Sequence, residues 1–204
     1  MSPSRAAALT VLSGLLAACT TKPITVDPAS VPLLPHTSDA PVMLKPAAFA
    51  EQPSHAVIDA AALCAIRLAD VRDVRPDPND LGMMIGRAVH ASDSAAWFRN
   101  AIETLKQDGH LRFVDTDADA QLVLRVELVK AYILVQNTQK SSNVVIRVVY
   151  SKGGTEFDTQ IARGRDEGAN WINGEDEAQG SLNRALLAAV GELDANISAH
   201  CRAL

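Results

Sequence analysis

A long alternation of apolar and polar residues in the second half of the chain limits most strongly what it can fold into. This period of two predicts a β-strand with one buried face. Its phase shifts near Lys130, which predicts a β-bulge or bend. Between Ala120 and Val135 the apolar positions are Leu122, Leu124, Val126 and Leu128, then Ala131, Ile133 and Val135.

Further strands are expected on both sides of this run. The chain turns at Gln139–Asn143, alternates again from Val144 to Tyr150, and turns at Gly153-Gly154. The more polar stretch Thr155–Arg163 predicts an edge strand. The preceding segments are a strand at Ala61–Asp73, a turn at Arg75–Asp80, a short segment at Gly82–Val89 and a brief pairing at His110–Val114.

Two helices complete the pattern. Asp93-Ser94 is suited to cap a helix that runs to about Asp108, and Gly109 is suited to end it. Glu175–Ala203 has apolar residues at helical spacing and three acidic residues at its start, where the helix dipole favours them. The sequence therefore predicts an α+β domain. Its sheet is twisted and largely antiparallel, has about four to five strands, is backed by two main helices, and follows a disordered N-terminal tether.

The N-terminus resembles a bacterial lipoprotein signal. Arg5 precedes the apolar run Ala6–Leu16, which is too short to cross a membrane, and Leu16-Ala17-Ala18-Cys19 has the form of a lipobox. We therefore expect residues 1–18 to be a signal peptide and Cys19 to be lipidated. The alternative is a plain secretory signal in which Cys19 is incidental. By the lipoprotein sorting rule that this resemblance implies, Thr20 indicates an outer-membrane anchor that faces the periplasm.

Residues 19–54 are expected to be a tether, because they hold seven of the ten prolines. The tether is either a spacer that lifts the domain from the membrane or a merely disordered leader. Met43, Leu44 and Phe49 are apolar enough to dock on the domain and shorten its reach. Residues 55–204 are expected to form a single periplasmic domain.

The charge of the chain limits its partners. The formal charge is −5. It becomes −6 once Arg5 is removed, because the chain then has 18 basic and 24 acidic residues. An acidic chain argues against nucleic acid and against direct adhesion to anionic headgroups. The sequence shows no catalytic set and implies no cofactor, and it assigns no oligomeric state.

Cys64 and Cys201 are the two remaining cysteines, and both lie on stripes expected to face the core. In an oxidising periplasm they are candidates for a disulfide between the two ends of the domain. Two buried reduced thiols are the alternative.

Arg72-Asp73-Val74-Arg75 is the most unusual polar stretch. Arg72 and Arg75 are possible contacts for a ligand or partner, since an arginine can bind a carboxylate or phosphate with two donors. The alternative is an Arg-Asp network that fixes the end of the strand to the turn. Trp97 and Trp171 are either exposed anchors for a partner or ordinary core residues.

Two segments contain residues that could form a metal site or a catalytic site, but an ordinary turn and a helix cap explain them better. Asp115–Asp119 resembles a calcium loop, but Ala120 and Val126 replace the expected Gly and Glu, so a solvated turn is favoured. His90 lies close to Asp93 and Ser94, which make an ordinary helix cap. No metal site is expected.

Several segments together resemble the YajG-like family of bacterial lipoproteins. They are the lipobox at Cys19, the Pro-rich leader, Val71–Arg75 with Ile85-Gly86, Leu105–Gly109, and Ala118–Leu122. The resemblance implies an envelope location and no catalytic residues.

These observations lead to two hypotheses. The first is a non-enzymatic outer-membrane lipoprotein whose periplasmic domain binds an envelope protein or lipid. The second is an auxiliary lipoprotein of a lipid-transport or ABC-type export system, which binds lipid or glycolipid. An apolar groove between helices and sheet would favour the second, and a filled core with an exposed apolar patch would favour the first.

Overall fold

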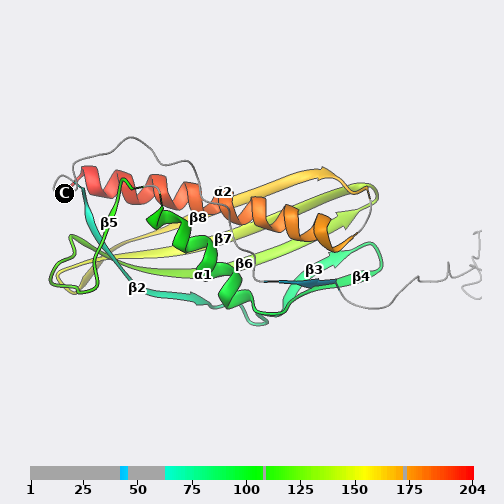
Figure 1. Cartoon of the computed structure of the whole chain (residues 1–204), viewed down its shortest axis with the longest axis horizontal. Coiled ribbons are helices and arrows are strands. Elements are labelled where there is room, and N and C mark those ends of the chain that lie inside the picture. Colours follow the sequence, from blue (N-terminus) through cyan, green and yellow to red (C-terminus); the bar gives the residue numbers. More distant parts are fainter. Residues whose placement is uncertain (1–41, 46–62, 108, 172–173) are drawn as a thin grey trace, which may run out of the picture. The chain divides into compact units, whose positions relative to one another are not determined.

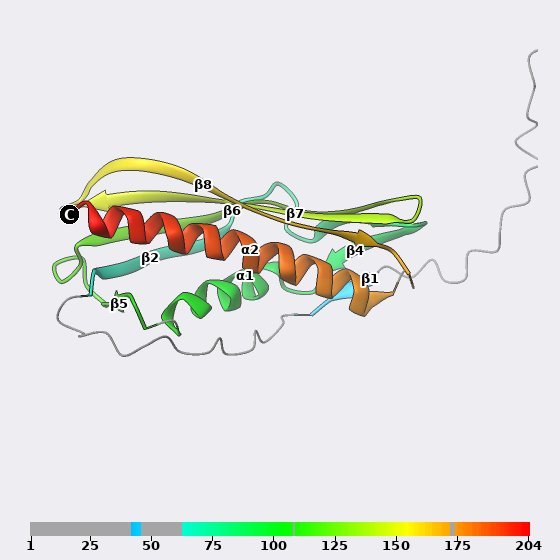
Figure 2. The same ribbon diagram turned by 90° about the horizontal axis from the view of Figure 1, so that it is seen from above.

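The computed structural model describes residues 42–45, 63–107, 109–171 and 174–204. Over these ranges it is an α+β domain, in which a mixed eight-stranded sheet has both helices on one face (Figures 1 and 2), and this confirms the predicted fold class. None of the helices in these ranges combines the length and the apolar character that crossing a membrane requires. The elements are β1 (Val42–Leu44), β2 (Ala65–Asp73), β3 (Asp80–Met84), β4 (Arg87–Ala91), α1 (Ser94–Glu103), a short 3₁₀-helix (Thr104–Lys106), β5 (Arg112–Phe113), β6 (Leu122–Gln136), β7 (Gln139–Lys152), β8 (Thr155–Ala169) and α2 (Glu175–Arg202).

Strand β6 organises the sheet. On one side it pairs over its whole length with β7, which in turn pairs with β8, and all three are antiparallel. On the other side its first half pairs in parallel with β2, and Ile133 and Leu134 in its second half pair in parallel with β3. The sheet therefore branches beside β6: β5 follows β2, while β4 and β1 follow β3.

A β-bulge between Leu128 and Lys130 gives β6 its change of phase, as predicted. Leu128 before the bulge and Ala131 after it are both buried, and both belong to the core between sheet and helices. The extra residue thus lets a bent strand present apolar side chains to the helices on both sides of the bend.

The helices pack closely on the sheet. Trp97 and Phe98 of α1 are buried, and the Trp97 indole donates a hydrogen bond to Asn183 of α2 (2.8 Å). Helix α2 crosses β8 at Gly164, where an added Cβ would lie 1.8 Å from the Ala185 carbonyl oxygen. Glycine is required at this crossing because the two backbones touch.

Three elements differ from the expectation. The segment expected at Gly82–Val89 is a hairpin of β3 and β4. The turn expected at Gln139–Asn143 lies at Asn137-Thr138, where Asn137 adopts a left-handed conformation (φ 57°). Strand β8 continues to Ala169. The sheet thus has more strands than the four to five expected, because β1, β3, β4 and β5 are too short to alternate clearly.

Strand β1 lies in the range expected as tether and pairs in parallel with β4 at the edge of the sheet. Val42 and Leu44 are buried, and the Leu44 carbonyl accepts hydrogen bonds from the backbone N–H and the hydroxyl of Ser92. The docking expected for Leu44 is therefore observed, whereas Phe49, the signal peptide and Cys19 lie outside the described residues.

Candidate functional site

The sheet face opposite the helices is a candidate binding surface. Figure 2 shows α1 and α2 on one side of the sheet and none of the described elements on the other. Along β7, Val144, Ile146 and Val148 face the helices and are fully buried. The residues between them, including Arg147, therefore point to the opposite face. We call this surface the bare face.

A buried carboxylate holds the arginines of the bare face in place. Glu127 of β6 is only 3% exposed, and it accepts hydrogen bonds from Nε of Arg147 (2.6 Å) and Nε of Arg72 (3.2 Å). Burial by itself would raise the Glu127 pKa, but the bonds and charges of these two arginines outweigh it and hold the pKa below its usual value. Glu127 is therefore ionised at neutral pH and fixes cations from β2 and β7 across the strand between them.

Arg72 is the exposed member of the arginine pair named from the sequence. Its side chain is about half exposed and also lies 3.2 Å from a carboxylate oxygen of Asp70. The hydrogen bond to Glu127 raises the pKa of Arg72 despite the opposing effect of desolvation. Arg72 thus offers a fixed, solvent-facing guanidinium on the bare face.

Arg75 lies inside the protein. Its side chain is 5% exposed, and its donors bond to both carboxylate oxygens of Asp73 and to the backbone carbonyls of Pro78, Asp80 and Ala131. It fills the point where the sheet branches between β2 and β3. The geometry supports the structural alternative, a network that fixes the strand end to the turn.

Trp171 is the most exposed large apolar residue that the structure describes, at 86%. It follows β8, and its backbone N–H donates to Glu177 (3.0 Å). The preceding residue, Asn170, donates from its backbone N–H to the Thr138 carbonyl (2.7 Å), which places this segment beside the β6–β7 turn. Trp97, in contrast, is a core residue.

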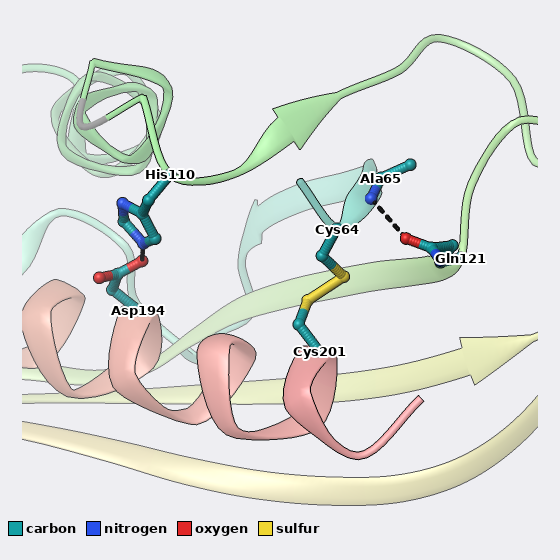
Figure 3. The surroundings of a disulfide bond; sticks show 6 residues. All are labelled: Cys64, Ala65, His110, Gln121, Asp194 and Cys201. Carbon is teal, nitrogen blue, oxygen red and sulfur yellow. Dashed lines mark hydrogen bonds and ion pairs between the residues drawn. A yellow bond between two sulfur atoms is a disulfide. The ribbon is translucent and has the colours of Figure 1, made fainter. Parts of the chain in front are cut away.

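Cys64 and Cys201 form a disulfide, the first of the two alternatives for this pair (Figure 3). It joins the residue before β2 to the last turn of α2, with 5.7 Å between the two Cα atoms. Nearby, His110 and Asp194 lie 2.8 Å apart, and the backbone N–H of Ala65 donates to Gln121 (2.9 Å) (Figure 3). Three contacts thus hold this end of the domain together.

Sequence reasoning missed a group of exposed apolar residues at the opposite end. Met83 of β3 and Leu134 of β6 are direct register partners, and both are exposed. They line a hollow of about 520 Å³ together with Tyr132 and Ala88. Leu134 also borders a second, more polar hollow of about 640 Å³ next to the β6–β7 turn. The sequence does contain one indication of this surface. Because side chains alternate along β6 after its bulge, a buried Ile133 implies that Leu134 points outward.

The remaining polar candidates have structural roles. Asp93 caps α1 through a hydrogen bond from the backbone N–H of Ala96 (2.8 Å), and the Ser94 hydroxyl bonds to Asp73, which confirms the cap. In the Asp115–Asp119 turn, Asp117 pairs with Arg67. Within the described ranges there is no cluster of three or more side chains suited to hold a metal ion.

Comparisons with known proteins support the fold only. No protein-family model matches the chain, and no curated protein matches its sequence. The structure of a hypothetical protein from Chlamydia trachomatis is similar at a TM-score of 0.50 and 11% identity, covering 70% of this chain and 99% of that one. A DUF330 protein from Xanthomonas campestris has a TM-score of 0.48 and 9% identity, covering 79% and 98%. A minor lipoprotein from Acinetobacter baumannii has a TM-score of 0.42 and 13% identity, covering 65% and 94%. At these identities, the Chlamydia likeness shows that the α+β arrangement also occurs in a protein of a different sequence.

Proposed function

We propose that this chain is a non-enzymatic lipoprotein of the outer membrane, anchored by lipid on Cys19, whose periplasmic domain binds another component of the envelope through its bare face. The proposed location in the outer membrane is supported by the lipobox, by Thr20 and by the resemblance to the YajG-like family. The observation that carries the binding role is structural: packed helices fill one face of the sheet, and no described element covers the other.

The filled face gives little support to the lipid-handling alternative. That function needs an apolar groove between helices and sheet. Here, α2 meets β8 in backbone contact at Gly164, and the core side chains of α1, Trp97 and Phe98, are at most 2% exposed. Within the described residues, the helix–sheet interface is packed and offers no such groove for an acyl chain.

The bare face has the features of a recognition surface. Arg72 and Arg147 are held by Glu127, so little side-chain entropy is lost when they bind a partner. Arg125 lies on the same face and pairs with Glu156 through a hydrogen bond of 2.8 Å. Further along the same face, seven residues beyond Glu127 on β6, Leu134 borders the two hollows, and the hollow shared with Met83 adds apolar contact area. A face that carries fixed charges and, further along, an apolar hollow suits a protein partner or a lipid with a polar head.

The anchor is tested by fractionation of cells. Cys19→Ala removes the thiol that would receive the lipid, so the protein is expected in the soluble periplasmic fraction, whereas the unchanged chain is expected in outer-membrane fractions. The Cys64→Ala/Cys201→Ala variant controls for loss of a cysteine elsewhere and should remain with the membrane. If Cys19→Ala still fractionates with membranes, the lipid anchor is wrong.

The binding face is tested by photo-crosslinking in living cells. A photoreactive amino acid replaces Arg163, which is exposed and lies between two residues of β8 that face α2, Ala162 and Gly164. The control position is Arg99, exposed on α1. A discrete adduct from Arg163 that is absent from Arg99 supports the proposal. Equal adducts from both positions, or adducts from Arg99 alone, contradict it.

A further inference from the structure

Exposed apolar residues gather at one end of the domain. Five of the eight large apolar side chains that are exposed in the described part of the chain lie there: Met43, Met83, Ile85, Leu134 and Trp171. Met83 pairs with Leu134, Ile85 lies in the β3–β4 turn, and Asn170 ties the Trp171 segment to the β6–β7 turn. Figure 1 shows β3, β4 and the β6–β7 hairpin together at this end. We call these five residues the apolar end.

The chain enters the domain at the same end. Strand β1 is parallel to β4, with Val42 opposite Val89 and Leu44 opposite Ala91. Strand β4 begins at Arg87, directly after the turn that contains Ile85. Val42 is therefore the end of β1 that lies toward this turn, so the first described strand begins on the side of the apolar end.

The segment between the expected lipid on Cys19 and the start of β1 is short. The 22 residues from Thr20 to Pro41 span at most about 75 Å when fully extended. A domain held within that distance meets the bilayer at an effective concentration in the millimolar range, so a weak apolar contact is enough to keep it there. This step rests on the lipid anchor of the proposed function.

We propose that the apolar end rests in the headgroup layer of the bilayer that holds the lipid of Cys19. Trp171 suits this position because an indole prefers the interface between acyl chains and water. The five residues come from β1, β3, β6, the β3–β4 turn and the segment after β8, and among them Met83 and Leu134 are the one pair of register partners. A protein interface has a fitted apolar core, whereas a fluid lipid surface accepts separate insertions.

Charge does not direct this contact. Helix α2 begins near this end with the exposed Glu175 and Asp176, Lys45 adds a positive charge close by, and Arg165 is paired with Glu167. The balance is mixed, so we expect the contact to depend on apolar insertion and to persist at high salt.

The two tryptophans allow a direct test with the full lipidated chain in vesicles of phosphatidylethanolamine and phosphatidylglycerol. Trp97 is buried and Trp171 is exposed, so subtraction of the emission of Trp171→Phe isolates Trp171. Only protein that floats with the vesicles is measured. With brominated acyl chains, Trp171 should lose most of its emission, and aqueous iodide should no longer quench it.

A tryptophan at the other end of the domain is the matched control. Phe157 is exposed there, close to the β7–β8 turn, so Phe157→Trp in the Trp171→Phe background should remain open to iodide and unaffected by bromine. Equal bromine quenching at both ends overturns the proposal. So does a Trp171 that stays open to iodide, or one shielded from iodide without bromine quenching, which would indicate a protein contact. A chain that fails to float overturns the lipid anchor itself.

Discussion

Arg72 and Arg75 are three residues apart at the end of β2, and their surroundings are opposite. Arg72 points to the bare face and shares Glu127 with Arg147, whereas Arg75 turns inward and satisfies the backbone carbonyls at the branch of the sheet. A buried cation that bonds to three backbone carbonyls from two segments is part of the fold. An exposed cation held on one carboxylate remains available to a partner.

We expect Arg75→Ala to lower the free energy of unfolding by about 3 kcal/mol, because it leaves the buried Asp73 carboxylate without its cation. Arg72→Ala should destabilise the domain much less, since its side chain is half exposed and solvent screens its ion pair. Urea denaturation of the two variants measures the difference. Equal losses would show that Arg75 has no special structural role.

The pKa values of three carboxyl groups allow us to predict how the free energy of unfolding depends on pH. Burial would raise the pKa values of Asp73, Glu127 and Asp166, but hydrogen bonds from neighbouring arginines and serines hold them below their usual values. Groups of this kind stabilise the fold above their unfolded pKa, near 4, and lose that contribution as the pH falls through the folded pKa. The urea midpoint should therefore be nearly constant from about pH 5 to 7 and fall below about pH 4. Glu127→Gln should lower the plateau and reduce the fall, whereas an unchanged acid profile in this variant would rule out the Glu127 contribution.

At the scale of elements, the contact between β8 and α2 depends on one missing side chain. The Ala185 carbonyl and the Ala189 amide of α2 both lie within 2.4 Å of the position that a Cβ of Gly164 would occupy. Because both neighbours are backbone atoms, the helix itself would have to move. The position of α2 on the sheet is thus set by Gly164.

Gly164→Ala is expected to destabilise the domain by about 3 kcal/mol, at the upper end of the cost of overpacking. Gly168→Ala, four residues further along the same strand, is the control, because an added Cβ there meets nothing within 4 Å. Thermal unfolding followed by circular dichroism measures both. Similar melting temperatures for the two variants would contradict the close approach of α2.

The sequence predicts best the elements in which a regular apolar spacing continues over many residues. Strand β6 with its bulge and helix α2 follow their apolar spacing closely. The sequence predicts a turn where β7 begins, because the residues that face the helices there are polar. Lys140 donates to Glu177, and the buried hydroxyls of Ser142 and Ser181 bond to each other. Such pairings join strand to helix across the chain, so no local pattern reveals them.

At the scale of the whole molecule, the Cys64–Cys201 disulfide closes the domain from its second strand to its last helix, across 137 residues of sequence. The pairing could be inferred from composition and position. The apolar end could not, because it depends on which strand pairs with the second half of β6. Met83 becomes the neighbour of Leu134 only through this parallel, non-local register.

Removal of the disulfide by Cys64→Ala/Cys201→Ala should lower the free energy of unfolding by about 3 kcal/mol, since the cross-link restricts the unfolded chain. The measurement is urea denaturation with and without reductant. Reductant should destabilise the unchanged chain by a similar amount and leave the double variant unaffected. If reductant affects neither protein, the disulfide contributes nothing to stability.

Strand β1 also defines how mechanical load enters the domain. A pull on the N-terminal side reaches Val42 first, and β1 is held by only three residue pairs with β4. The disulfide and the long β6–β7–β8 ladder lie beyond it along the chain. Under tension β1 would therefore detach first and take Val42 and Leu44 out of the core, while the pairs of the longer strands stay intact. Of the described elements, β1 is thus the one that a pull from the N-terminal side would separate first.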